Sequence, residues 1–327
     1  MLMKSEETLV QVENLRMYFP VKGGVVRRKV ADIKAVDGIS FSIKKGETLG
    51  LVGESGSGKS TTARCILWLH KATGGKIFFM GKDLSKLGDA GMKSVRRDMQ
   101  MIFEDPYYSL DPRMLVGDII AEPMRIHKVA DDEERKKRVA ELLMMVHLEP
   151  NMAERYPHQF SAGQRQRIEI ARALALRPSF VVCDNPVSEL DVSIQAQIIA
   201  LLEWFRGWLN LSYLFISHDL AVVRYLCDRC MVMYVGKIME SADTDELFSN
   251  PLHPYTKALL SAVLIPDPEA EHRRKLIILP GETPSSINPP VGCRFHPRCS
   301  IVMDICKEQP PELKNVGGEH YVACHRV

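Results

Sequence analysis

The 327-residue sequence has no apolar run of about 18 residues, the shortest stretch expected to cross a bilayer as a helix. Residues 1–7 also lack the features of a secretory signal peptide. An excess of charge of one sign is missing too, because 43 Lys and Arg residues balance 41 Asp and Glu residues and leave a net charge of +2. Without a strong basic field, nucleic acid is excluded as the main partner. If the protein serves a membrane, we expect it to do so as a peripheral cytoplasmic subunit.

A complete phosphate-binding loop lies near the start of the chain. Residues 53–60 read GESGSGKS and match G-x-x-x-x-G-K-[ST] at every fixed position. The apolar run before it, residues 48–52, predicts a buried strand, and residues 62–70 predict a helix. In such a loop the backbone N–H groups and the helix N-terminus bind phosphate, the lysine reaches the β- and γ-phosphates, and the hydroxyl ligates Mg²⁺. The expected nucleotide-binding residues are Gly53, Ser55, Gly56, Ser57, Gly58, Lys59, Ser60 and Thr61.

Further motifs follow in a fixed order. They are IFEDP at 102–106, FSAGQRQR at 160–167, FVVCD at 180–184, SELD at 188–191 and ISHD at 216–219. Together with the phosphate-binding loop, this order resembles the nucleotide-binding domain of ABC transporters over about residues 8–250. The motifs then match the Walker A, Q-loop, signature, Walker B, D-loop and H-switch. The resemblance implies an α/β fold of the ABC-type P-loop NTPases, with a mixed sheet core and a helical subdomain at about residues 106–170.

The resemblance also implies how ATP and Mg²⁺ are bound. In this family two domains dimerise head to tail, and each ATP lies between the Walker A motif of one subunit and the signature helix of the other. Mg²⁺ would be held by Ser60, Asp184 and Glu104. An early aromatic residue stacks on adenine, and by position Phe19 matches best, with Tyr18 as the second choice and packing on the early sheet as the alternative. The signature residues expected at the ATP bound by the opposite subunit are Ser161, Ala162, Gly163 and Gln164.

The sequence departs from the family pattern at catalytic positions. A glutamate normally follows the Walker B aspartate and polarises the attacking water, but here the residue is Asn185. An amide cannot accept the proton, and loss of a general base typically costs about 10²–10⁴ in rate. The Q-loop glutamine is replaced by Glu104, whose charge opposes the γ-phosphate unless it binds the metal. The second signature glycine is Ala162, whose methyl group costs about 1 kcal/mol or more if φ is positive there and little if the residue is helical.

These departures are distributed unequally over a dimer. Asn185 and Glu104 affect the site built on this chain's own Walker motifs, whereas Ala162 affects the opposite site. A homodimer would carry every departure twice. We therefore expect a heterodimer with a competent second ABC ATPase, in which this chain provides the weaker catalytic site and retains His218 as the switch histidine. The alternative is that Asn185 is tolerated and hydrolysis is merely slower.

The composition changes after about residue 250, where the sequence is rich in proline and cysteine and shows little hydrophobic periodicity. This part contains HPYTKALL at 253–260, PGE at 280–282, CRFHPRC at 293–299 and VACH at 322–325. These segments closely resemble the C-terminal extension of oligopeptide and dipeptide ABC importers, of the second-ATPase type. The resemblance implies an ABC domain at residues 1–250 and an extension at residues 251–327. It also implies that the imported ligand is a peptide, or a nickel-type ligand that related systems carry.

Four cysteines of this extension, Cys293, Cys299, Cys306 and Cys324, follow the spacing C-x5-C-x6-C-x17-C. Thiols stay reduced in the cytosol, which disfavours disulfides. Four thiolates in a short segment with a small core favour a structural metal site instead. The family resemblance favours a [4Fe–4S] cluster, and Zn²⁺ is the alternative because spacing alone does not select the metal. Buried, inert thiols are the other possibility.

We therefore predict an ATP-binding subunit that powers peptide import from the cytoplasmic face of the cell membrane. The expected partners are a second ABC ATPase, two transmembrane permease subunits and, indirectly, an extracytoplasmic substrate-binding protein. A regulatory protein that binds ATP with little turnover is the alternative. An ABC ATPase of DNA repair or translation would need a long coiled-coil insertion or tandem domains, and the sequence has neither. The transported ligand is not encoded in this chain, because the binding protein and the permeases select it.

Overall fold

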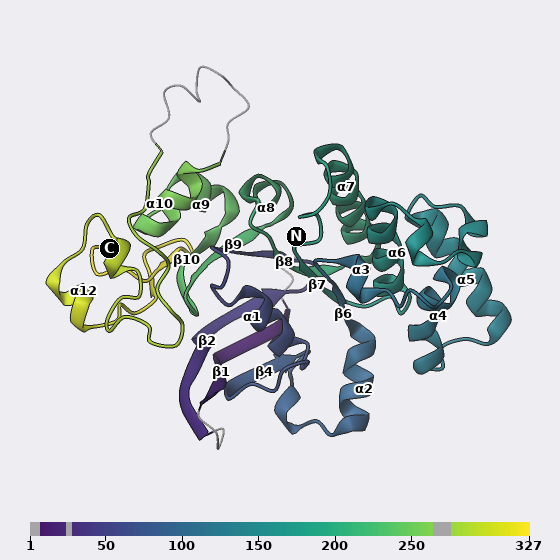
Figure 1. The fold of residues 1–327 in the computed structure, drawn as a ribbon, viewed down its shortest axis with the longest axis horizontal. Helices are drawn as coiled ribbons and strands as arrows, with labels where there is room; N and C mark the ends of the chain where they lie inside the picture. Colours follow the sequence, from purple (N-terminus) through teal and green to yellow (C-terminus); the bar gives the residue numbers. More distant parts are fainter. Residues whose placement is uncertain (1–6, 24–27, 264–275) are drawn as a thin grey trace, which may run out of the picture. The chain divides into compact units, whose positions relative to one another are not determined.

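The computed structural model describes residues 7–23, 28–263 and 276–327 (Figure 1). The prediction about a signal peptide falls mostly on residues 1–6, which lie outside the described residues. The described residues form two compact units. The helical unit comprises residues 7, 44–47 and 86–215, and the P-loop unit comprises residues 8–23, 28–43, 48–85, 216–263 and 276–327. No helix among the described residues is long and apolar enough to span a membrane.

Six of the eleven α-helices that the described residues form lie in the helical unit. Its strands β6 (Met99–Ile102) and β7 (Phe180–Asp184) pair in parallel, and β8 (Ser212–Ile216) follows β7 in the order β8-β7-β6. Its helices are α2 (Asp89–Asp98), α3 (Pro106–Ser109), α4 (Val116–Ile126), α5 (Asp132–Met145), α6 (Ala162–Leu174) and α7 (Val192–Leu209), with short 3₁₀ turns at Pro150–Glu154 and Pro157–Gln159.

Local sequence signals explain where these helices begin. The side chain of Asp131 accepts the Glu134 N–H (2.9 Å) at the start of α5, and Asp191 accepts the Ile194 N–H (3.0 Å) at the start of α7. Helices α4, α5 and α6 pack on one another over buried apolar faces (Figure 1). Helices α4 and α5 lie within residues 106–170 and α6 extends to Leu174, and the bounds given for the helical subdomain stay a prediction.

The P-loop unit combines two groups of strands with the extension. One sheet has the order β2-β1-β4-β5, and in the other group the order is β11-β12-β10-β9-β3. The strands are β1 (Thr8–Gly23), β2 (Arg28–Lys44), β3 (Thr48–Val52), β4 (Gly74–Phe79), β5 (Lys82–Asp83), β9 (Arg229–Tyr234), β10 (Lys237–Asp243), β11 (Lys314–Asn315) and β12 (Tyr321–Val322). The helices are α1 (Lys59–Ile66), α8 (Leu220–Leu226), α9 (Thr244–Ser249), α10 (Pro254–Ser261) and α12 (Asp304–Glu308), with 3₁₀ turns at Leu84–Lys86 and His296–Arg298.

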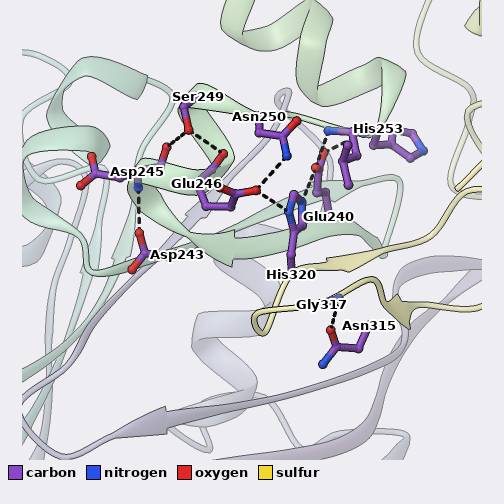
Figure 2. Close-up of polar contacts among 11 residues, drawn as sticks. Glu240, Asp243, Asp245, Glu246, Ser249, Asn250, His253, Asn315, Gly317 and His320 are labelled. Carbon is purple, nitrogen blue, oxygen red and sulfur yellow. Dashed lines mark hydrogen bonds and ion pairs between the residues drawn. The ribbon is translucent and has the colours of Figure 1, made fainter.

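The extension joins the P-loop unit through a strand and a buried histidine. Strand β12 pairs antiparallel with β10, so that Glu240 lies opposite Val322. Glu240 is fully buried, and its carboxylate accepts the backbone N–H groups of Leu252 (2.7 Å) and His253 (3.0 Å). His320 Nε2 lies 2.8 Å from the same carboxylate (Figure 2). A buried carboxylate with three such partners fixes the end of the chain on β10.

Candidate functional site

The phosphate-binding loop connects β3 to α1 and needs its glycines for two different reasons. Gly53, Gly56 and Gly58 all have positive φ, at 147°, 76° and 109°. A Cβ atom on Gly53 would lie 2.1 Å from the carbonyl oxygen of Met233, and one on Gly58 would lie 2.2 Å from that of Ala35. A Cβ atom on Gly56 would meet nothing within 4 Å. Gly53 and Gly58 are therefore required for close backbone approach as well as conformation, and Gly56 for conformation alone.

Lys59 extends back over the loop that precedes it. Its Nζ donates to the carbonyl oxygens of Gly53 (2.8 Å) and Glu54 (2.9 Å) and lies 3.3 Å from the hydroxyl of Ser57. Only 8% of Lys59 is exposed, so its ammonium group is held against this loop, and its contact with phosphate stays a prediction. Ser60 follows as the second residue of α1 and is half-buried. The helix ends at Ile66, earlier than the predicted 62–70, because Trp68 has a φ of 55°.

The two aromatic candidates for adenine stacking lie on β1. The half-buried ring of Phe19 packs edge-on against His70, with the ring centroids 5.6 Å apart. The hydroxyl of Tyr18 instead donates to Asp37, and burial together with that hydrogen bond raises the pKa of Tyr18 to about 12. Tyr18 is thus engaged within the unit, which favours Phe19 for stacking, a role that stays a prediction. His218 of the same unit is exposed just before α8.

The helical unit brings together two of the three departures from the family pattern, Asn185 and Glu104. Asp184, which ends β7, is only 3% exposed, and Asn185 follows it with a φ of 47°. Asparagine tolerates this left-handed conformation better than most residues. The Asn185 side-chain amide donates to the carboxylate of Glu104 (Nδ2–Oε1, 3.3 Å). An amide and a carboxylate therefore pair at the end of β7, although the motifs that supply them are 81 residues apart.

The Q-loop segment is held by two residues of α6. Glu169 accepts the backbone N–H of Phe103 (3.0 Å), and Arg172 Nη1 donates to the carbonyl oxygen of Ser109 (2.6 Å). Glu169 is fully buried, and burial raises its pKa to about 7 despite the nearby Arg172. Neither residue is predictable from the sequence, because both lie in a helix whose pattern indicates only an amphipathic face.

The signature residues form the start of α6. Ser161 and Gln164 make a reciprocal capping box, with the Ser161 hydroxyl accepting the Gln164 N–H and the Gln164 side chain accepting the Ser161 N–H. Ala162 is the first helical residue and has no positive φ, so its methyl group costs little, the milder of the two predicted outcomes. A Cβ atom on Gly163 would lie 2.6 Å from Cγ2 of Ile194, so this glycine allows α6 to approach α7 closely.

The roles predicted for Ser60, Asp184 and Glu104 in Mg²⁺ binding stay predictions, since Ser60 belongs to the P-loop unit and the other two to the helical unit.

The four cysteines of the extension are free thiols in the P-loop unit. Burial raises the pKa of Cys293 to about 11, and the other three cysteines lie near enough to add to this rise. Cys293 N–H also donates to the carbonyl oxygen of Cys306 (2.8 Å). Among the described residues, however, no group of three or more His, Cys, Asp or Glu side chains is arranged to hold a metal ion. The donor set of the predicted cluster is present, but this arrangement does not support a [4Fe–4S] or Zn²⁺ site.

Comparison with protein families gives two matches. Residues 36–188 match the model described as ABC transporter, and residues 239–306 match the C-terminal region of the oligopeptide/dipeptide transporters. The oligopeptide transport ATP-binding protein AppF of Bacillus subtilis is 53% identical over 98% of both chains. The oligopeptide transport ATP-binding protein OppF of Salmonella typhimurium is 48% identical over 100% of this chain and 98% of its own length.

Solved structures of ATP-binding cassettes are also similar. The dimeric post-hydrolysis state of the ATP-binding cassette MJ0796, bound to ADP and Pi, is 30% identical with a TM-score of 0.63 and covers 72% of this chain and 99% of its own. The cbiO1 protein of Clostridium perfringens is 25% identical with a TM-score of 0.64 and covers 75% and 92%. The predicted fold class, a mixed sheet with a helical subdomain, is confirmed.

Proposed function

This chain belongs to the ABC transporter family of ATPases and, within it, to the oligopeptide transport ATP-binding proteins, and from that premise we propose how it shares the work of ATP hydrolysis. Its general function is that of an ATP-binding subunit that powers the import of peptides through a membrane ABC transporter. Within such a transporter, this chain is the catalytically weak half of a heterodimeric ATPase pair, and turnover occurs mainly at the partner's site.

One observation carries this proposal. At the end of β7, where the family has a carboxylate to take the proton from the attacking water, this chain has the amide of Asn185, hydrogen-bonded to Glu104. An amide orients water but cannot act as a general base. The intact loop with Lys59 and the buried Asp184 still support binding of Mg-ATP. Binding without efficient hydrolysis is the combination expected of one half of an asymmetric pair.

The partners follow from the family. Two transmembrane permease subunits carry the peptide, the chain lies at their cytoplasmic face as a peripheral subunit, and an extracytoplasmic binding protein delivers the substrate. The second ATPase supplies the catalytic glutamate that this chain lacks. The native mass of the purified transporter, measured with this chain tagged, tests that composition. A complex with two copies of this chain and no other ATPase would contradict it.

A structural metal centre on Cys293, Cys299, Cys306 and Cys324 remains part of the proposal. Its support is the chemistry of the donor set alone, four free thiols in one short segment, because the arrangement of these side chains does not itself form a metal site. The test is iron, sulfide and zinc analysis of anaerobically purified protein. A metal-free protein in which the segment after residue 290 resists proteolysis would reject the metal centre.

Transport itself is tested with the transporter reconstituted in proteoliposomes. ATP-driven uptake of a labelled oligopeptide should be lost with Lys59→Ala, because the ammonium group that binds the phosphates is removed. ATP binding by the isolated chain should weaken in the same variant. Equal ATP affinities for Lys59→Ala and the unaltered chain would show that the loop does not bind the nucleotide.

A further inference from the structure

Two side chains of the extension reach the second residue of the phosphate-binding loop. Arg298 Nη1 donates to both carboxylate oxygens of Glu54, at 3.0 and 2.8 Å. The backbone N–H of Glu54 donates to the hydroxyl oxygen of Tyr255 at 2.8 Å. Arg298 lies next to Cys299, and Tyr255 lies in α10, so both come from the part of the chain after residue 250.

The ion pair between Arg298 and Glu54 is largely buried. The Arg298 side chain is 10% exposed and that of Glu54 27%. Arg298 also donates to the carbonyl oxygen of Pro280 (Nε–O, 3.3 Å), and Thr283 donates its hydroxyl to Glu54. Tyr255 is fully buried, with its ring centroid 5.4 Å from that of Phe295. Because these partners are packed and hydrogen-bonded, the geometry at Glu54 is fixed from the side of the extension.

A second arginine of the extension, Arg294, contacts the turn at Val235 and Gly236, which in turn contacts the phosphate-binding loop. Arg294 donates to the carbonyl oxygen of Val235 and to the carboxylate of Asp37. Val235 has a φ of 41°, which is strained for a β-branched residue and requires such support. The next residue, Gly236, donates its N–H to the carbonyl oxygen of Ser57 at 2.8 Å. The extension thus contacts the loop directly at Glu54 and, through the turn at Val235 and Gly236, indirectly at Ser57.

The contacts of Arg298 and Tyr255 with Glu54 can affect phosphate binding in two ways. The carbonyl oxygen of Glu54 accepts from Lys59 Nζ, so the orientation of this peptide group helps to place the ammonium group. Its carboxylate carries a negative charge in a loop that binds anionic phosphates, and a nearby cation compensates that charge. Without Arg298, the carboxylate would oppose the nucleotide.

We propose that Arg298 and Tyr255 are positioning residues for the phosphate-binding loop, through which the extension sets the affinity of the loop for ATP. This inference rests on the proposed ATP-binding function of that loop. The residues act through Glu54 and do not touch the reacting atoms. The extension therefore controls nucleotide binding, whereas the rate of the chemical step depends on other residues.

Titration of the full-length chain with ATP, together with steady-state hydrolysis by the assembled transporter, tests the inference. Arg298→Gln should weaken ATP binding about tenfold or more, the size expected for a lost charge-assisted hydrogen bond, with a raised KM and a nearly unchanged kcat. Arg326→Gln is the matched control, because this arginine of the extension is exposed and donates to the carbonyl oxygen of Ile301 (2.9 Å), away from the phosphate-binding loop. It should bind ATP as the unaltered chain does.

The decisive arm is the double variant Arg298→Gln with Glu54→Gln. Removal of the uncompensated carboxylate should restore much of the ATP affinity, which would not happen if Arg298 only stabilised the fold. Tyr255→Phe, which deletes one hydroxyl, should weaken binding about two- to tenfold and serves if Arg298→Gln does not fold. Unchanged ATP affinity in Arg298→Gln or in Tyr255→Phe, or no recovery in the double variant, would overturn the inference. A normal ATP affinity in Lys59→Ala would instead reject ATP binding at the loop.

Discussion

Asn185→Glu restores the family residue, yet the structure predicts little benefit from this change alone. The new carboxylate would lie where the Asn185 amide now meets Glu104 at 3.3 Å. Two unit charges at that separation repel by about 1 kcal/mol at the dielectric of water and by about 5 kcal/mol at an effective dielectric of 20. Glu104 is exposed, so the true value lies towards the lower end. The φ of 47° costs a glutamate about 1 kcal/mol more.

The gain should appear only when both positions are changed. In Asn185→Glu with Glu104→Gln, the amide and the carboxylate exchange places and one hydrogen bond between them can be kept. We expect hydrolysis at this chain's site to rise about 10²-fold, the lower range for a positioned general base. Glu104→Gln alone should give no gain. Asn185→Asp offers a further control, because aspartate tolerates the left-handed backbone and introduces the same charge.

The assay is single-turnover hydrolysis of ATP by the assembled transporter, with the partner ATPase's Walker B glutamate replaced so that only this chain's site is counted. Binding of ATP is measured in parallel to separate affinity from chemistry. If Asn185→Glu alone is as fast as the double variant, the contact between residues 104 and 185 does not limit the site. That result would refute the coupling inferred from the structure.

Three further predictions concern stability. Burial lowers the pKa of His253 from 6.5 to about 4. As pH falls, this histidine is therefore protonated in the unfolded chain before it is protonated in the folded one. About 3 kcal/mol of stability is lost between pH 6.5 and pH 4. His253→Asn keeps an acceptor for the Tyr255 N–H and should remove this loss in urea unfolding curves. Burial raises the pKa of Glu169 to about 7 from 4.5, so its contribution has the opposite sign: about 3 kcal/mol is lost as pH rises from 4.5 to 7. Glu169→Gln should remove that dependence in the same measurement. Gly163→Ala should destabilise the protein by about 1–3 kcal/mol, because the added methyl group would lie 2.6 Å from Ile194.

Each of these has an outcome that would count against it. If the difference in unfolding free energy between variant and unaltered protein is the same at pH 5 and pH 7, His253 or Glu169 does not contribute the expected pH dependence. For Gly163→Ala the control is Ala162→Gly, one residue earlier on the exposed side of the helix start. Equal unfolding free energies for the two variants would show that the close approach of α6 and α7 is not a constraint.

Local patterns predicted the parts of the site that local geometry determines. The strand, loop and helix around residues 48–66 follow from a motif whose glycines are required by positive φ or by close approach. The signature residues were predicted from their motif alone, and the capping box that Ser161 and Gln164 form within one turn of helix was not predicted. The helix after the loop was predicted at residues 62–70 but spans Lys59–Ile66, and it ends early because Trp68 has a left-handed backbone.

Contacts between distant segments were not predictable. The Asn185–Glu104 pair joins residues 81 apart, and the Arg298–Glu54 pair joins residues 244 apart. In the sequence, each of these four residues stands out only as part of its own motif. A single sequence carries no signal for how two distant loops meet. The four cysteines of the extension likewise identify sulfur as the donor atom of a metal site, but their spacing does not predict where the four sulfur atoms lie.

In the assembled transporter, this chain should bind ATP but leave most hydrolysis to its partner. The partner ATPase's Walker B glutamate is replaced by glutamine while this chain stays unchanged, and steady-state ATP hydrolysis is measured. Because Asn185 supplies no general base, steady-state hydrolysis should fall about 10²-fold or more with ATP binding retained. Near-normal hydrolysis in that transporter would contradict this prediction, since the site with Asn185 would then be competent on its own.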